Sequence, residues 1–256
     1  MKTVCEKYWK HDMPDSYKFE VNWKHYFRIT RMKTTFLKRV IQYGEIKKGT
    51  RVLDIGAGGG TDSMPLALMG AEVTALEYNK SIACNLVDYI EAMRKYTGKK
   101  PSIKVIVDDF MDANLKKGYY DVVISNGVLE HYLNEDERKD FIKKLFYVTK
   151  KGGYIITGVP NGKHPYRKLF REKEYGGNNK SLPELNYDKE LFEEYFGKCM
   201  VDGIYLFMWV FSFPVLLSPL KYLILPFYTI IRLYESCFPR WFRRKYGFWL
   251  LCVVRK

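Results

Sequence analysis

The stretch that most constrains the fold of this chain is RVLDIGAGGGTD, at residues 51–62. Its apolar residues Val52, Leu53 and Ile55 suit a strand buried in a sheet. The glycines that follow suit a turn through which backbone can approach a ligand closely. The turn leads into a helical segment, whose amino-terminal dipole favours an acidic or electron-rich group. This strand, glycine turn and helix predict an α/β fold that binds a nucleotide-like ligand at the turn.

The spacing of the glycines narrows the class of ligand. Gly56, Gly58 and Gly60 follow the order G-x-G-x-G, whereas the dinucleotide fingerprint G-x-G-x-x-G would place its third glycine at Thr61. The turn is therefore a poor match to a pyrophosphate cradle. With Asp54 two residues ahead of the first glycine, it resembles the first motif of the class I S-adenosylmethionine-dependent methyltransferases.

Two further apolar runs end at acids that suit the same cofactor. The run 71–76 ends at Glu77, about 20 residues past the first glycine, where an open α/β sheet places the acid that binds a ribose. The run 103–107 ends at an acidic pair and a phenylalanine. There the family has a carboxylate near the adenine amino group and an apolar residue near its ring, and we assign these roles to Asp109 and Phe110.

The fourth apolar run supplies a candidate base. Residues 120–125 lead into NGVLEH, and a leucine-acid-histidine ending is frequent after this strand in the family. His131 would lie at the carboxyl edge of the sheet, and its unperturbed pKa of about 6.5 suits proton transfer near neutrality. Packing near the cofactor, or orienting a loop, is the alternative role for this histidine. We assign Glu130 to the start of a helix and Asp121 to the start of a strand.

The resemblance implies S-adenosylmethionine as methyl donor and S-adenosylhomocysteine as product. Asp54 is expected to brace the glycine turn through backbone hydrogen bonds, with direct cofactor contact as the alternative. The residues expected at the cofactor are Asp54, Gly56, Ala57, Gly58, Glu77, Tyr78, Asp109, Phe110 and Asn126. The alternative to cofactor binding is a doubly wound α/β protein whose glycine turn binds no ligand.

Strand and helix signals alternate along the chain, which predicts a parallel sheet with helices on both faces and ligands at the carboxyl ends of the strands. By resemblance the fold is a Rossmann-like sheet of seven strands whose last strand is antiparallel. The expected helices cover residues 35–43, 62–69, 80–96, 135–149 and 188–196, and the expected last three strands cover residues 154–159, 204–211 and 248–254.

We divide the chain at residue 45. Residues 1–45 are rich in aromatic and basic side chains, and family members commonly place such a segment over the cofactor as a lid. Residues 46–256 form the expected methyltransferase domain, in which residues 161–186 are a loop on the substrate side. Second-rank catalytic candidates in the lid and in this loop are His25, Tyr26, His164 and Tyr166. Each has an ordinary loop or packing role as its alternative.

Residues 212–246 form an apolar and basic insertion before the last strand. The uncharged run 203–220 is long enough to count as a transmembrane candidate, but Pro214 and Pro219 argue against one straight span. A span would also remove residues 248–254 from the sheet. Apolar residues backed by cations suit a segment in the headgroup region instead, and packing on the protein's own domain or on a second copy is the alternative. The cations expected on anionic lipid are Arg232, Arg240, Arg243, Arg244 and Lys245.

The net charge agrees with an anionic partner. There are 43 Lys and Arg residues against 29 Asp and Glu, a formal charge of +14. We do not expect nucleic acid, because zinc-finger spacing, basic heptads and RNP-like strands are absent from the sequence. The five cysteines are scattered without a metal spacing or a disulfide framework, and the first residues lack the apolar core of a signal peptide. We therefore expect no metal and a cytoplasmic protein, attached peripherally to the inner face of a membrane.

Together these patterns predict a methyltransferase that methylates an oxygen of a small or lipid-like acceptor at a membrane surface. One scaffold of this type serves many acceptors, so two alternatives stay open. The acceptor is a soluble metabolite or a glycan in the first, and the chain is a cofactor-binding scaffold without transfer activity in the second. A homodimer is compatible with all three.

Overall fold

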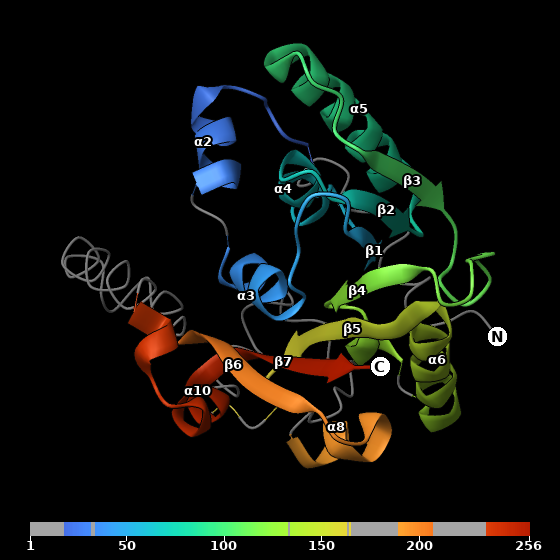
Figure 1. Ribbon diagram of the computed structural model, residues 1–256, viewed down its shortest axis with the longest axis vertical. Coiled ribbons are helices and arrows are strands. Elements are labelled where there is room, and N and C mark those ends of the chain that lie inside the picture. Colours follow the sequence, from blue (N-terminus) through green and yellow to red (C-terminus); the bar gives the residue numbers. More distant parts are fainter. Residues whose placement is uncertain (1–17, 32–33, 133, 163, 165–188, 207–233) are drawn as a thin grey trace, which may run out of the picture. The chain divides into compact units, whose positions relative to one another are not determined.

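The computed structural model describes residues 18–31, 34–132, 134–162, 164, 189–206 and 234–256 (Figure 1). Its helices are α2 (Trp23–Arg31), α3 (Thr35–Tyr43), α4 (Ser63–Leu68), α5 (Lys80–Thr97), α6 (Glu135–Val148), α8 (Lys189–Phe196) and α10 (Arg240–Tyr246), with short 3-10 turns η2 (Leu129–His131) and η4 (Glu235–Cys237). Its strands are β1 (Arg51–Ile55), β2 (Glu72–Glu77), β3 (Ile103–Val107), β4 (Tyr120–Asn126), β5 (Thr149–Pro160), β6 (Met200–Leu206) and β7 (Gly247–Arg255).

The seven strands follow the order β3-β2-β1-β4-β5-β7-β6. Strand β1 is parallel to β2 and β4, and β2 is parallel to β3. Strand β7 runs the other way, because Gly152 and Gly153 exchange backbone hydrogen bonds with Lys256 at one end of β5 while Asn161, just past its other end, donates to Phe248. The predicted seven-stranded sheet with an antiparallel last strand is confirmed.

The described chain forms two compact units. The first ends at Thr157 and includes Val253–Lys256, and the second is Gly158–Cys252. The described part of the expected lid, helices α2 and α3, belongs to the first unit. The first unit contains all of β1 to β4 with helices α2 to α6.

Register places the ends of four strands of the first unit at one edge of the sheet. Ile55, the last residue of β1, lies opposite Leu76 of β2 and Ser125 of β4. Glu77, the last residue of β2, lies opposite Val107, the last residue of β3. Figure 1 shows β3, β2, β1 and β4 side by side in this order. The loops that follow these strands therefore leave the sheet at the same edge.

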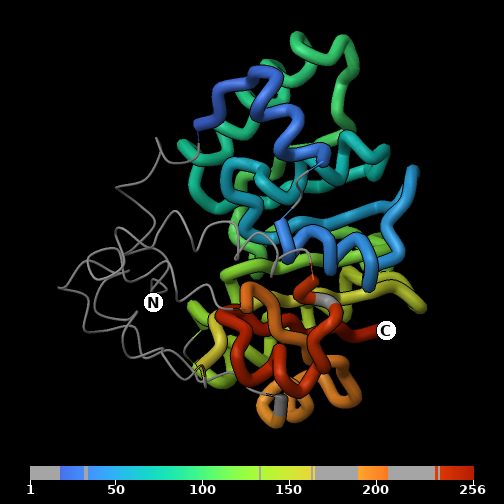
Figure 2. The backbone as a smooth tube through the Cα atoms, turned by 90° about the vertical axis from the view of Figure 1, so that its left-hand side faces the viewer, coloured from blue at the N-terminus to red at the C-terminus, as the bar shows by residue number. Residues whose placement is uncertain are grey.

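An apolar cluster holds helices α2, α4 and α5 on β2 and β3. Helix α5 is preceded by the cap residue Asn79, whose side chain accepts hydrogen bonds from the backbone of Ser81 and Ile82. It is followed by Gly98 in the left-handed conformation. The buried cluster joins α2, α4, α5 and the sheet through Ile29, Ala57, Met64, Ala75, Leu86, Tyr89, Ile90 and Met93. Figure 2 shows the blue segment of α2 lying against the teal and green segments of α4 and α5.

Most of the predicted elements agree with the structure. The expected helix over residues 35–43 has the predicted bounds, and those of α4, α5 and α6 lie within one residue of them. The last of the predicted helices, α8, begins at Lys189 and ends beside Gly197 in the left-handed conformation, as expected. The predicted starts of β5 and β6 are wrong by five and four residues, since β5 begins at Thr149 and β6 at Met200.

The early start of β6 has a cause in the second unit. Asp202 lies in β6 and is fully buried, and its carboxylate accepts hydrogen bonds from Nε and Nη2 of Arg243 in α10, at 2.7 and 2.9 Å. A side chain at the next residue, Gly203, would collide with the Arg243 carbonyl oxygen. Asp202 and Gly203, near the start of β6, are therefore held by contacts with Arg243 of α10, 41 residues past Asp202 along the chain.

Residues 207–211 of the expected sixth strand and residues 212–233 of the insertion lie outside the described residues. Within the part that the structure describes, no helix has the length and hydropathy needed to span a bilayer. The expectation that Arg243 faces lipid is wrong, because this side chain is 7% exposed and paired with Asp202. Arg240 and Lys245, on the same helix, are exposed.

Candidate functional site

Four loops meet at the carboxyl edge of the sheet in the first unit. Gly56 follows β1, Glu77 ends β2, Asp108 follows β3 and Asn126 ends β4. In open α/β sheets, ligands bind at this edge, where the strand order changes direction. The order here reverses at β1, between β2 and β4. The structure thus brings together the segments in which the sequence predicts cofactor residues.

The glycine turn is fixed against β2. The backbone N–H groups of Gly56 and Ala57 both donate to the Leu76 carbonyl oxygen, at 2.9 and 3.0 Å. Gly56 has φ 68°, in the left-handed region where glycine is favoured. A Cβ atom at this position would lie 2.5 Å from Cγ2 of Val128. The turn therefore requires glycine at its first position, both for its backbone conformation and for the space beside it.

Glu77 joins the glycine turn to the end of β2. Its Oε2 atom accepts a hydrogen bond from the backbone of Gly58 at 2.9 Å, and its Oε1 atom accepts one from Asn79 at 2.9 Å. Burial raises the pKa of this carboxyl, against the effect of its backbone donors. A carboxylate has about four lone-pair sites, so these two bonds leave acceptor capacity for hydroxyl groups of a ligand.

Two further acids stand beside the glycine turn. Asp54 is buried and its Oδ2 accepts a hydrogen bond from the hydroxyl of Ser63 at 2.6 Å, so it braces the start of α4 by a side-chain contact. Burial, with the nearby charges of Asp62 and Glu77, raises the pKa of Asp54 to about 8. Asp62 is half-buried, with Oδ2 at 3.4 Å from Nδ2 of Asn126, and desolvation raises its pKa to about 6.

Asp62 is a site residue that the sequence analysis did not single out. It stands at the amino-terminal cap position of α4, yet its carboxylate makes no capping hydrogen bond to that helix. The signal in the sequence was a second acid close to the glycines, in the same short motif as Asp54. In the described part of the chain, no Lys or Arg forms an ion pair with Asp54, Asp62 or Glu77. The turn is therefore electronegative and suited to a cationic ligand.

The loop after β3 carries the residues that the sequence predicts near the adenine. Asp109 Oδ1 accepts a hydrogen bond from the Met111 backbone at 2.7 Å and so shapes the loop. The ring of Phe110 is only 3% exposed and packs edge-on against Phe141, with ring centres 4.9 Å apart. Phe110 thus lies in the core in this structure. The exposed apolar side chain at the end of β3 is Val107.

His131 lies in the 3-10 turn that follows β4. Burial lowers the pKa of its imidazole, and this effect exceeds that of a hydrogen bond with the Gly127 backbone, which raises it. The ring is therefore mostly neutral at pH 7 and can accept a proton. Glu130 lies in the same short helix, as its predicted structural role requires. The end of β2 also carries Tyr78, which is exposed.

The second-rank candidates are spread over both units. His25 is buried in the first unit, with Nε2 at 2.6 Å from the Tyr89 hydroxyl, and burial lowers its imidazole pKa. Tyr26 is partly buried against the apolar cluster. His164 is buried in the second unit, and Tyr166 lies outside the described residues. His25 and Tyr26 thus have packing roles in the lid.

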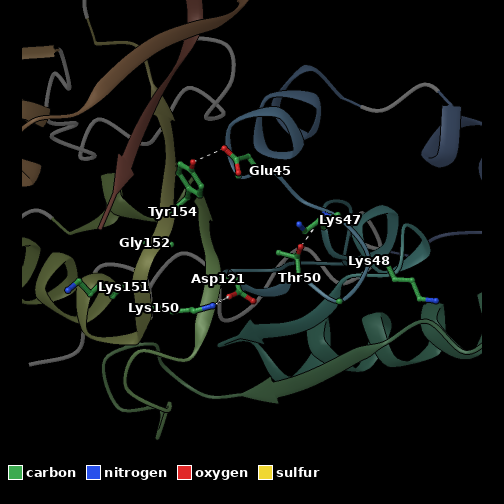
Figure 3. A pocket seen from close by; sticks show the side chains of 12 residues that line it. Glu45, Lys47, Lys48, Thr50, Asp121, Lys150, Lys151, Gly152 and Tyr154 are labelled. Carbon is green, nitrogen blue, oxygen red and sulfur yellow. Dashed lines mark hydrogen bonds and ion pairs between the residues drawn. The ribbon is translucent and has the colours of Figure 1, made fainter.

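A separate pocket of about 290 Å³ lies at the amino-terminal edge of the sheet in the first unit (Figure 3). It is lined by residues 44, 45, 47–50, 121 and 150–154. Asp121 forms ion pairs here with Arg51 at 3.0 Å and Lys150 at 3.1 Å, which confirms its structural role at the start of β4. Lys48 and Lys151 point away from each other and outward. The basic side chains do not converge, so this pocket is not assigned to a ligand.

Comparison with known proteins agrees with the carboxyl-edge site. Residues 53–157 match the family model described as a methyltransferase domain. Over 175 residues the chain is 28% identical to the ubiquinone biosynthesis O-methyltransferase of Rickettsia prowazekii, covering 57% of this chain and 64% of the relative. Over 161 residues it is 31% identical to phosphoethanolamine N-methyltransferase 3 of Arabidopsis thaliana, covering 60% and 29%. The chain spans less than two thirds of the length of these two relatives.

Two solved structures share the fold. Phosphoethanolamine N-methyltransferase 2 of Haemonchus contortus, in complex with S-adenosyl-L-methionine, has a TM-score of 0.56 at 15% identity and covers 90% of this chain and 56% of its own. A SAM-dependent methyltransferase of Archaeoglobus fulgidus has a TM-score of 0.54 at 17% identity and covers 92% and 100%. These similarities confirm the predicted Rossmann-like α/β fold.

Proposed function

We propose that this chain, whose residues 53–157 match a methyltransferase domain model, is a class I S-adenosylmethionine-dependent methyltransferase that transfers the methyl group of this cofactor to an oxygen of a small, lipid-like acceptor at a membrane surface. The observation that carries the proposal is the meeting of the glycine turn with Glu77, Asp62 and Asn126 at one edge of the sheet. The charge of this edge supports the choice of cofactor.

The residues at the edge fit S-adenosylmethionine. The cofactor carries an ammonium and a sulfonium group, and the carboxylates of Glu77 and Asp62 provide negative charge for these cations beside the glycine turn, whereas Asp54 is mostly protonated at pH 7. Glu77 retains acceptor capacity for the ribose hydroxyls. Asp62 and Asn126, which face each other across the turn, are assigned to the amino-acid part of the cofactor.

The protein has to supply little of the chemistry of methyl transfer. When bound, the cofactor supplies an electrophilic methyl group on a sulfur that is its own leaving group. The chain's own residues hold and orient the cofactor, and His131 accepts a proton from the acceptor hydroxyl. Its partly buried imidazole is neutral near pH 7, which suits this role.

The nature of the acceptor is inferred from the second unit and from the relatives. One relative is named for ubiquinone biosynthesis, and the quinone-type acceptor in that name is lipid-like. In the described part of the insertion, helix α10 exposes Arg240, Lys245 and Trp241, the last with 62% of its surface. Cations beside an exposed indole are typical of a segment in the headgroup region. These features support our proposal of a peripheral membrane protein, and its cytoplasmic side stays a prediction from the sequence.

Labelled methyl transfer into extracts tests the acceptor class. The full chain is incubated with methyl-labelled cofactor and a membrane lipid extract, and the label is measured in the organic and aqueous fractions. We expect label in the organic fraction, and its loss in His131→Ala while the cofactor still binds. Label found only in the aqueous fraction would favour a soluble acceptor. Tight cofactor binding without product in any extract would favour a scaffold.

A further inference from the structure

The outer face of helix α2 consists only of aromatic and cationic side chains. The exposed residues of this helix are Trp23, Lys24, Phe27, Arg28 and Arg31. Trp23 is 67% exposed and Phe27 is 51% exposed, although large apolar side chains are usually covered. The sequence of the helix, WKHYFRITR, contains no acid. Neither the glycine turn nor the candidate base uses any of these five side chains.

Helical geometry gathers these side chains into one stripe. Trp23 and Phe27 are four residues apart and so lie one turn apart on the same face. Lys24 and Arg28 repeat the same spacing beside them, and Arg31 extends the cationic row. The Lys24 ammonium lies 5.7 Å from the centre of the Trp23 ring. The stripe therefore presents two rings with a row of positive charge along one side.

The opposite face of α2 is tied to the cofactor side of the first unit. Ile29 is buried in the cluster that contains Ala57 of the glycine turn and Met64 of α4. His25 is buried beside Tyr89 of α5, with Nε2 and the hydroxyl oxygen 2.6 Å apart. These contacts hold the helix in place, so its aromatic and cationic stripe must face outward. The stripe is a fixed surface of the expected lid.

We propose that α2 is an interfacial helix, whose outer face docks on an anionic lipid bilayer. Exposed rings enter the headgroup region while flanking Lys and Arg side chains reach lipid phosphates, which is the pattern of helices that lie in a membrane surface. The three cations of the stripe, and the absence of any acid in the helix, match a negative surface. This contact goes beyond the proposed function and is separate from the insertion in the second unit.

The composition of the stripe favours lipid over nucleic acid. Readers of base edges use amide and hydroxyl side chains beside their cations, and the exposed face of α2 carries none. Trp23 and Phe27 also lie on the same exposed face of one helix, so both rings can enter the headgroup region of a bilayer together. Because Ile29 contacts the cluster of the glycine turn, the membrane contact and the cofactor site would share this helix.

Vesicle binding of the full chain tests the proposal. Co-sedimentation is measured with mixed phosphatidylglycerol–phosphatidylcholine vesicles and with pure phosphatidylcholine vesicles. One variant combines Lys24→Gln, Arg28→Gln and Arg31→Gln. The matched control combines Lys95→Gln, Lys99→Gln and Lys100→Gln, which remove the same charge from exposed positions at the end of α5.

We expect the α2 cation variant to bind anionic vesicles roughly 100-fold more weakly than the wild type, and the control to change binding only severalfold. A second variant, Trp23→Ser with Phe27→Ser, should weaken binding to both kinds of vesicle. Unchanged cofactor affinity and thermal midpoint would show that each variant is folded. Equal vesicle binding by the α2 variants and the control overturns the proposal.

Two further measurements distinguish docking by α2 from docking by the insertion and from nucleic-acid binding. An Arg240→Gln, Lys245→Gln variant of α10 tests the insertion alone, and no acceptor or transfer activity is needed in either assay. Loss of binding only in the α10 variant supports the proposed function and refutes docking by α2. Binding of a single-stranded oligonucleotide that depends on the α2 cations, without vesicle binding, also refutes it.

Discussion

Asp62 makes the cofactor affinity of this protein depend on pH. Its carboxyl has a pKa of about 6 in the protein without ligand, because burial disfavours its charged form. A bound cation favours the charged form and lowers this pKa. Protonation of Asp62 must therefore weaken the binding of S-adenosylmethionine, and Asp62→Asn should remove this part of the pH dependence.

The size of the effect follows from the pKa. The apparent dissociation constant is multiplied by one plus the ratio of protonated to ionised Asp62 in the free protein. For a pKa of about 6 this factor is about 1.1 at pH 7 and about 11 at pH 5. The cofactor ammonium stays protonated over this range. Affinity should thus fall about tenfold between pH 7 and pH 5.

Isothermal titration of the full chain with S-adenosylmethionine at several pH values measures this ratio. Burial lowers the pKa of His131, and any positive charge that its imidazole gains as the pH falls is the same in both proteins and cancels in their comparison. Asp54, with a pKa of about 8, stays mostly protonated throughout. The difference between the wild type and Asp62→Asn isolates Asp62. An equal pH dependence in the two proteins refutes the assignment of Asp62 to the cofactor.

The same substitution should stabilise the protein without ligand. A carboxyl whose folded pKa lies above its unfolded value of 3.8 releases its proton more readily when the chain unfolds, so its stability contribution falls as the pH rises from about 4 to about 6. The difference between the folded and the unfolded pKa of Asp62 corresponds to about 3 kcal/mol of unfolding free energy at pH 7 before solvent screening. For a half-buried group, screening reduces this loss of stability to about 1–3 kcal/mol. Thermal unfolding should show Asp62→Asn above the wild type at pH 7 and equal to it near pH 4.

Three other substitutions test the site and the second unit. Gly56→Ala should lower the unfolding free energy by about 2 kcal/mol and weaken cofactor binding in the titration. The control is Gly49→Ala, which has a similar positive φ but open space around it and should leave cofactor binding unchanged. His131→Ala should lower kcat by about 10²–10⁴ with unchanged cofactor affinity, and a change in affinity alone would return it to a packing role. Asp202→Ala leaves Arg243 buried without its partner and should destabilise the second unit by about 3 kcal/mol, visible as faster hydrogen exchange in β6.

The sheet edge was predictable from sequence because its signals are local. Each of the first four strands is a short apolar run that ends at a glycine or a polar residue, and these boundaries agree with the structure. Helix α5 was predictable for a similar reason, since Asn79 caps its start and Gly98 ends it. Parallel pairing then brings the strand ends together without further information.

The wrong strand boundaries depend on contacts distant in sequence. The first residues of β5 read as the end of a helix and a glycine turn, but Gly152 and Gly153 pair with Lys256 at the other end of the chain. Asp202 and Gly203 read as a polar loop, and become part of β6 because Arg243 covers them. Neither partner can be identified from the residues near the strand.

The site residues divide in the same way. Glu77 was predictable because its position at the end of a strand fixes its place. The packing of Phe110 against Phe141 could not be predicted, because an apolar residue after a strand suits the core as well as a ligand, and its predicted contact with the adenine ring stays a prediction. Asp62 was missed because its importance lies in meeting Asp54 and Glu77 in space. No periodicity in the sequence marks such a cluster.

The acidic cluster also bears on product release. S-adenosylmethionine carries one positive charge more than S-adenosylhomocysteine, because methyl transfer removes the charge of the sulfonium. Glu77 and ionised Asp62 therefore attract the donor more strongly than the product, and the attraction falls when the methyl group leaves. We expect the wild type to bind donor more tightly than product at pH 7, and Asp62→Asn to narrow this preference in competition titrations. An unchanged ratio would mean that Asp62 senses only the ammonium group, which donor and product share.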